Sequence, residues 1–160
     1  MTRRVLTIAV LVAAALLGRS TPAAADVTAF FGSTSAPTSH GVKGTAVGVG
    51  LIIVGFEFEY AQATEDPTRG VPGLTTGMGN VLVQTPSSKR QIYFTAGAGL
   101  FRETTGTQSA SSYGTNVGGG VKLKLAGPLR LRLDYRVFTL HGDARYPNPQ
   151  RFYAGLNVSF

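Results

Sequence analysis

The chain has 160 residues, no cysteine and a formal net charge of +7 at pH 7. The lack of cysteine excludes a disulfide framework and a lipid-modified cysteine. Its basic residues alternate with leucine along predicted strands and do not gather with aromatic residues on one face, so we expect no nucleic-acid partner.

The first 25 residues have the organisation of a cleavable signal peptide. Two arginines lie within Met1–Arg4, an apolar stretch runs from Val5 to Gly18, and Ala23–Ala25 offer an A-x-A cleavage site before Asp26. The apolar stretch is shorter than the roughly 20 residues of a spanning helix, which favours cleavage over a retained anchor. Cleavage removes three of the 15 basic residues and no acidic one, so residues 26–160 carry a formal charge of +4 and form one predicted domain.

Eight segments of about ten residues follow, separated by regions that contain turn residues. Several of them alternate apolar with polar or small residues, as strands with two different faces do. The predicted strands are 27–33, 43–51, 54–63, 74–84, 91–102, 114–125, 129–140 and 150–160.

Long and short connections alternate between these strands. The predicted long connections, 34–42, 64–73, 103–113 and 141–149, hold most of the prolines, which cannot donate to a strand ladder. The short ones are 84–90, 126–128 and a turn within 50–55. That turn has no polar residue, but a single strand over 44–63 would run to roughly 65 Å, far more than a membrane needs. Outer-membrane barrels have this asymmetry, with tight periplasmic turns and longer outer loops.

Charged and apolar residues alternate most clearly in the seventh predicted strand, 129–140. Leu129, Leu131, Leu133, Tyr135 and Val137 share one face, and Arg130, Arg132, Asp134 and Arg136 share the other. In the third segment, Phe56 and Phe58 oppose Glu57 and Glu59 in the same way. A soluble barrel would turn its apolar face inward, and a membrane barrel turns it outward.

Three features favour the membrane arrangement. The charged face holds both signs, glycines fall where a narrow eight-stranded lumen needs small residues, and no apolar helix is available to cover a soluble sheet. The glycines predicted to face inward are Gly48, Gly50, Gly97, Gly99, Gly118 and Gly120.

The charged face predicts a network of ions inside the lumen. Its predicted members are Glu57, Glu59, Lys122, Lys124, Arg130, Arg132, Asp134 and Arg136. A plug in which carboxylates satisfy the basic groups is favoured over an anion filter, because each ion needs a partner in a poorly hydrated interior. Aromatic residues near strand ends are expected either at the membrane interfaces or in ordinary lipid-facing positions. These are Tyr60, Tyr93, Phe94, Tyr135, Phe152 and Phe160.

The last strand alternates an apolar face with a face of small and polar residues. The apolar face consists of Phe152, Ala154, Leu156, Val158 and Phe160. With this aromatic-terminated strand and the export signal, the chain resembles the small bacterial outer-membrane β-barrel proteins of the OmpA, OmpX and opacity types. Their assembly machinery recognises a closing strand of this kind, which makes Leu156, Val158 and Phe160 the expected assembly signal.

The resemblance implies an all-β fold, an eight-stranded antiparallel up-and-down transmembrane β-barrel in the outer membrane. It implies a structural or surface-interaction role carried by four outer loops. The expected partners are outer-membrane lipid and lipopolysaccharide, the barrel assembly machinery and an unknown surface partner.

The sequence gives less support to catalysis, to ligand binding or to conduction. Ser39 beside His40, and Asp143 near His141, lie in predicted outer loops, where lipid A deacylases and palmitoyltransferases of similar shape use Ser and His. Their motifs are not matched here, so we expect no enzyme, no cofactor and no metal site. Two alternatives stay open: a soluble lipocalin-like binder with Phe56, Phe58 and the leucines of 129–133 inside, and a narrow passive pore.

Overall fold

The structure is a computed structural model that describes residues 24–35 and 38–160. Most of the predicted signal peptide, including the apolar stretch and Ala23, lies outside the described residues. Ala24 and Ala25 begin the first strand.

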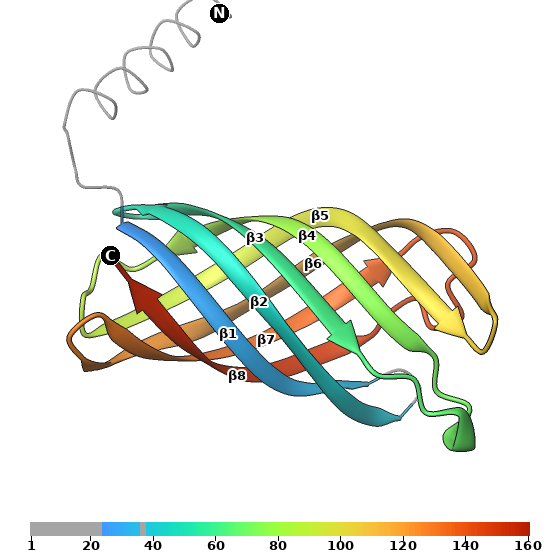
Figure 1. Cartoon of the computed structure of the whole chain (residues 1–160). Helices are drawn as coiled ribbons and strands as arrows, with labels where there is room; N and C mark the ends of the chain where they lie inside the picture. Colours follow the sequence, from blue (N-terminus) through green and yellow to red (C-terminus); the bar gives the residue numbers. More distant parts are fainter. Residues whose placement is uncertain (1–23, 36–37) are drawn as a thin grey trace, which may run out of the picture.

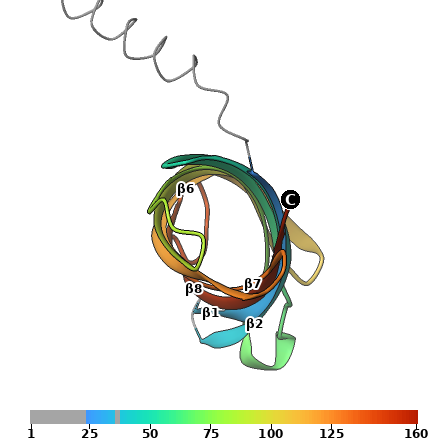
Figure 2. The same cartoon turned by 90° about the vertical axis from the view of Figure 1, so that its left-hand side faces the viewer.

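Eight antiparallel strands form one closed barrel (Figures 1 and 2), as the sequence predicts. They are β1 (Ala24–Ser35), β2 (Ser39–Leu51), β3 (Val54–Ala63), β4 (Gly73–Gln84), β5 (Arg90–Thr105), β6 (Gln108–Ala126), β7 (Leu129–Leu140) and β8 (Gln150–Ser159). Each strand pairs with the next in sequence, and β8 pairs with β1. Such closure satisfies the backbone N–H and C=O groups that an open sheet edge would expose to hydrocarbon.

Strand alternation turns the apolar side chains outward. In β3, Phe56 and Phe58 are 52% and 54% exposed, whereas Glu57 and Glu59 between them are buried. In β7, Arg132, Asp134 and Arg136 are buried in the same alternating way. The faces that a lipocalin-like cavity would need inside are therefore on the outside, as in a membrane barrel. No helix in residues 24–35 and 38–160 is long and apolar enough to cross a membrane.

The short connections lie at the end of the barrel that holds both described ends of the chain (Figure 1). The predicted turn within 50–55 is present as Ile52–Ile53 between β2 and β3. Ile52 adopts a φ of 32°, a conformation that a β-branched residue rarely takes outside a strained turn. Both isoleucines are exposed, so the apolar belt continues to the tip of this turn.

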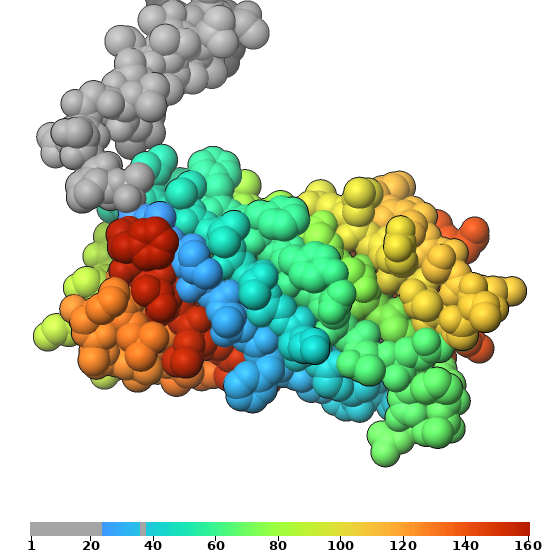
Figure 3. All heavy atoms as spheres, in the orientation of Figure 1, coloured from blue at the N-terminus to red at the C-terminus, as the bar shows by residue number. Residues whose placement is uncertain are grey.

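The long connections lie at the opposite end. Two of them have about the predicted length, and the other two are shorter. Residues 64–72 and 141–149 stay outside the strands, and the former contains the short 3-10 helix η1 (Pro67–Arg69). This helix forms a knob at one end of the barrel (Figure 3). The Thr68 hydroxyl donates to Asp66 at 2.5 Å and holds the pKa of the Asp66 carboxyl below its usual value.

The prediction that 103–113 and 34–42 are loops is wrong. β5 and β6 continue to a tight turn, with Thr105 opposite Gln108, and β1 continues to Ser35 opposite Ser39. Serine and threonine fill these strand ends, and outside the membrane neither face of a hairpin has to be apolar. The backbone ladder therefore continues where the hydrophobic pattern stops.

A charged residue on the lipid-facing belt should destabilise the barrel. Val117 is 59% exposed and faces outward from β6. We expect Val117→Arg to lower the free energy of unfolding in lipid vesicles by about 2–4 kcal/mol, measured by urea titration. Lys43→Arg, which keeps a charge at an exposed position of β2, is the control. Equal stability of Val117→Arg and the control would contradict the assignment of this face to lipid.

Candidate functional site

The lumen is filled at mid-height by charged side chains from three strands. We call Glu57, Glu59, Arg132, Asp134, Arg136 and Arg151 the ionic layer. β3 and β7 lie four places apart in a ring of eight strands, so their inward faces meet across the lumen. All six side chains are buried, and three carboxylates face three guanidinium groups.

Every acid of the ionic layer contacts at least one arginine. Glu57 accepts from Arg132 through both carboxylate oxygens and from Arg136 at 2.8 Å. Asp134 accepts from Arg132 at 3.0 Å and from the Arg136 Nε at 2.9 Å. Glu59 lies 3.0 Å from Arg151 and 3.2 Å from Arg136. Such two-point contacts are the geometry that guanidinium and carboxylate groups favour.

Two tyrosines connect this layer to the barrel wall. The Tyr93 hydroxyl donates to Asp134 and accepts from the Arg132 Nε at 2.7 Å. The Tyr153 hydroxyl donates to Glu59 at 3.1 Å, and Arg132 stacks over both rings. The expectation of an interfacial or lipid-facing Tyr93 is wrong, because Ile92 and Phe94 take the outward positions of β5 and leave Tyr93 inside.

The remaining predicted members lie nearer the short connections. Lys122 is buried and pairs with Asp26 at 2.5 Å. Arg130 donates to Gln91 at 3.4 Å, and Lys124 is exposed; neither forms an ion pair in the part of the chain that the structure describes.

Sequence reasoning missed three inward-facing charged residues, Arg151, Asp26 and Glu103, the last of which was predicted to begin a loop. Arg151 shares the inward face of β8 with Tyr153, so alternation in the last strand could have identified it. Asp26 precedes the predicted start of the first strand, and only a longer strand places it inside.

An apolar cluster lies in the lumen between the ionic layer and the long connections. Along β7, Arg132, Asp134 and Arg136 are followed by Phe138 and Leu140, which belong to this cluster. Phe30 stacks on Tyr153 with ring centroids 4.0 Å apart, and Ala144 packs on the cluster from the 141–149 connection. Two successive layers of buried side chains therefore occupy the lumen, one ionic and one apolar.

Two carboxylates form hydrogen bonds with backbone N–H groups of the outer connections. Glu103 of β5 accepts the Arg145 backbone N–H at 2.9 Å, and Glu65 accepts the Gly106 N–H at 2.6 Å. The first bond ties the 141–149 connection to the barrel wall, and the second ties the tip of the β5–β6 hairpin to its neighbour.

The histidines do not form a catalytic arrangement. The His40 Nδ1 lies 2.9 Å from the Thr38 carbonyl, Ser39 contacts Ser33, and the His141 ring stacks on Tyr113. Among the described residues, neither ring has a hydrogen bond to a serine or a carboxylate, and no three metal-ligating side chains gather. Nucleophilic catalysis would require the base within hydrogen-bond reach of its nucleophile.

The predicted assembly-signal residues face lipid along β8. Leu156 and Phe160 are 52% and 73% exposed, and Val158 lies between them on the same face. Phe160 exchanges two backbone hydrogen bonds with Ala25, both of 2.9 Å, at the seam that closes the barrel.

No protein-family model matches the sequence, and no curated protein compared with it matches. Solved structures with the same architecture do match. Neisserial surface protein A has 15% identity and a TM-score of 0.70 over 88% of this chain and 98% of its own. The N-terminal β-barrel domain of Pseudomonas aeruginosa OprF has 15% identity and a TM-score of 0.62 over 86% and 97%.

The fold is that of the small outer-membrane β-barrels. The apolar outer face is the surface of a barrel that spans a membrane. The outer membrane enzyme PagL shares the fold, with 11% identity and a TM-score of 0.55 over 83% of this chain and 98% of its own. Because an enzyme has this architecture, the fold does not decide whether the chain is catalytic, and activity has to be argued from the side chains.

Removing two partners of the ionic layer together should cost less than the sum of the costs of removing each one alone. Arg132→Met leaves Glu57 and Asp134 short of a cation, and we expect a loss of about 3–5 kcal/mol in the free energy of unfolding. Arg132→Met combined with Glu57→Gln should lose less than the two single variants added together, as residues in one network do. Urea titration in lipid vesicles measures all three variants, and strict additivity would contradict the coupling.

Proposed function

We propose that this chain is a closed outer-membrane barrel with a structural or surface-interaction role, carried by the connections at its outer end. The observation that carries this proposal is the ionic layer, in which three acids and three arginines satisfy one another inside a narrow lumen. With the lumen filled, the parts of the molecule free to meet other molecules are its rim and its lipid-facing wall.

The filled lumen argues against a passive pore. A permeating ion would have to displace a carboxylate or a guanidinium from partners at 2.8–3.2 Å and leave a buried charge unpaired. Rings of arginine that select anions in pores are not neutralised in this way.

The outer end supports a surface role. β5 and β6 form a hairpin that extends past the belt to Gly106, and Glu65 holds its tip in place. Serine and threonine cover much of this hairpin, which makes it a stiff polar surface outside the membrane. A non-catalytic role agrees with the separate environments of His40 and His141.

The proposal includes export through a cleavable signal peptide and assembly through the last strand. Cleavage before Asp26 would remove the signal peptide 1–25, including the Ala25 partner of Phe160, and leave the barrel domain 26–160, whose seam begins at the pair Asp26–Ser159. The assembly machinery would engage Leu156, Val158 and Phe160, which form one lipid-facing row on the strand that closes the barrel.

Planar-bilayer recording tests the closed lumen. We expect the wild-type barrel to give no conductance steps, because the ionic layer and the apolar cluster block the path. The variant Glu57→Ala/Arg132→Ala/Phe138→Ala removes one acid and one base of the ionic layer and the β7 phenylalanine of the apolar cluster, keeps the ionic layer neutral, and should give small steps. Wild-type conductance whose ion preference reverses on Arg132→Glu would overturn the closed-lumen proposal and favour a pore.

A shortened hairpin tests the surface role. Deleting Thr104, Thr105, Gln108 and Ser109 removes two register pairs and leaves the inward and outward faces of β5 and β6 unchanged. We expect cells that display this variant to adhere less to one another and to epithelial cells than cells with wild-type protein at equal surface density. The control is Thr107→Ser, which keeps the hairpin at full length. Equal adhesion of all three would contradict a surface role for the hairpin.

A further inference from the structure

We propose that the outer mouth of the barrel binds a short zwitterionic peptide, in a pocket between the β5–β6 hairpin and the 141–149 connection. The proposal names a ligand class for the surface role, so it rests on the proposed function, which places this end of the barrel outside the membrane. The pocket has a volume of about 420 Å³, within the range of sites that bind small molecules.

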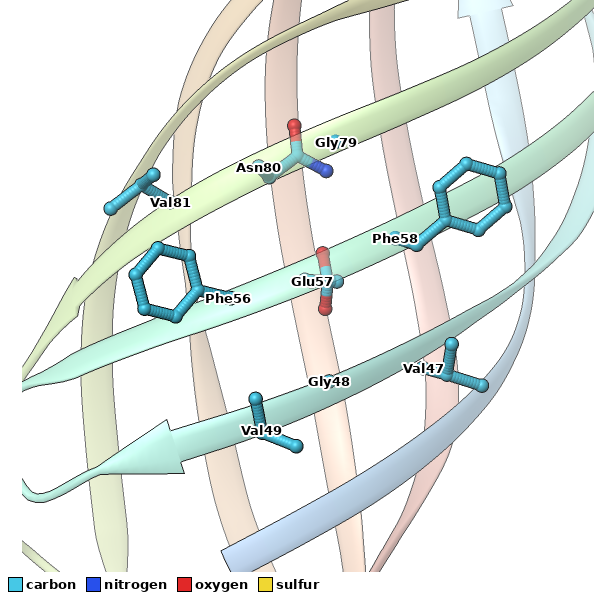
Figure 4. Close-up of a pocket in the computed structure, with 9 residues that line it drawn as sticks. All are labelled: Val47, Gly48, Val49, Phe56, Glu57, Phe58, Gly79, Asn80 and Val81. Carbon is cyan, nitrogen blue, oxygen red and sulfur yellow. The ribbon is translucent and has the colours of Figure 1, made fainter. Parts of the chain in front are cut away.

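The lining of this pocket is mostly polar. It consists of Glu103, Thr105, Gln108, Ser109, Ala110, Asp143 and Arg145. Another hollow, of about 480 Å³, lies on the lipid-facing wall, but valine and phenylalanine side chains of β2, β3 and β4 surround it (Figure 4), and membrane hydrocarbon suits that surface. The outer pocket is therefore the better candidate for a polar ligand.

The carboxylate of Glu103 is buried without a cation. Only 7% of this residue is exposed, and one of its oxygens accepts the Arg145 backbone N–H at 2.9 Å. Within residues 24–35 and 38–160, Oε1 of Glu103 has no hydrogen-bond partner and the carboxylate forms no ion pair. A water molecule that donated to Oε1 would leave the charge unneutralised, and an unpaired buried charge is costly. An ammonium group supplies both the proton and the charge.

The neighbouring side chains do not supply this partner. His40 and Tyr146 share a small cavity with Glu103, and neither donates to it. The His40 Nδ1 lies 2.9 Å from the Thr38 carbonyl, so a neutral ring donates there and leaves Nε2 as an acceptor. Two acceptors cannot satisfy each other, which leaves the carboxylate available to a ligand.

Two further charges line the pocket from the 141–149 connection. Asp143 and Arg145 are exposed, and neither forms an ion pair in the part of the chain that the structure describes. With Glu103 they give the pocket two acids and one base. A ligand that carries an ammonium group and a carboxylate can pair with both kinds of group, whereas a simple anion would face two carboxylates.

The hairpin side of the pocket offers hydrogen-bonding groups. Thr105, Gln108 and Ser109 bring two hydroxyls and one amide, which can both donate and accept. Such groups suit a peptide bond, which carries one N–H and one C=O. Among the described lining residues Ala110 is the only apolar one, so the ligand's own side chains should be small. A dipeptide such as alanyl-alanine combines these properties.

Titration of the barrel in detergent micelles with L-alanyl-L-alanine, followed by amide NMR, tests the site. We expect the backbone resonances of Glu103, Ser109 and Arg145 to shift with one common affinity. Glu103→Gln should weaken binding at least tenfold, since it removes the charge but keeps an acceptor for the Arg145 N–H. Asp143→Asn and Arg145→Gln should each weaken binding several-fold.

Stability separates a binding role of Glu103 from a structural one. Without peptide, Glu103→Gln should unfold at the same or a higher urea concentration than wild type, because the wild-type carboxylate is buried without a cation. Lower stability together with unchanged peptide affinity would overturn the binding role. The matched controls are Arg102→Gln, on the outward face of β5, and Asp66→Asn, at the same end but outside the pocket; both should bind like wild type.

Variants of the peptide test the ligand class. Equal binding of N-acetyl-alanyl-alanine would overturn the ammonium contact, and equal binding of alanyl-alanine amide would overturn the carboxylate contact. If calcium ions displaced the peptide and produced the same shifts, the occupant would be a metal ion and the proposal would be wrong. Binding is measured on the isolated barrel. If shortening the hairpin lowers adhesion while no peptide binds, this site alone is overturned and the proposed function stands.

Discussion

Mutual neutralisation of charges inside the lumen is the interaction on which the rest of this barrel depends. A buried guanidinium is costly unless a carboxylate and further hydrogen-bond acceptors surround it. Arg132 and Arg136 reach such partners only if β3 and β7 both turn their charged faces inward. A one-residue slip of β3 would put Glu57 and Glu59 into lipid and Phe56 and Phe58 into the ionic layer. The ionic layer therefore fixes the orientation of the lipid-facing belt as well as the contents of the lumen.

Different forces dominate at different heights of the barrel. At mid-height, ion pairs and tyrosine hydroxyls connect β3, β5, β7 and β8 across the lumen. Toward the outer end an apolar cluster replaces them, and beyond the belt the backbone ladder of β5 and β6 remains with single carboxylate contacts to neighbouring connections. Stability is thus concentrated inside the membrane, and the outer end keeps its shape mainly through backbone pairing.

The sequence predicted the part of the fold that the membrane constrains. Alternation in 129–140 and 54–63 identified β7, β3 and five members of the ionic layer, because lipid on one side and charge on the other leave a clear pattern. The same logic failed beyond the belt, where Ser109 and Ser111 belong to a strand without any apolar alternation. Arg151 was missed although its strand was predicted, because the rest of its face, from Tyr153 to Ser159, is uncharged and gives no sign of an ionic layer. Which charged residues pair inside the lumen, such as Lys122 with Asp26, depends on the register between strands that are distant in sequence. No local sequence pattern predicts these pairs.

The β5–β6 hairpin has a consequence for how its surface can change over time. Its shape is set by paired backbone groups and by the Gly106–Thr107 turn, and hardly by which side chains it displays. Polar residues there can be exchanged for others without disturbing the ladder or the lumen. The hairpin therefore keeps its shape while the side chains on its surface change. Such changes would let the protein evade antibodies or phages that recognise those side chains, without loss of the fold.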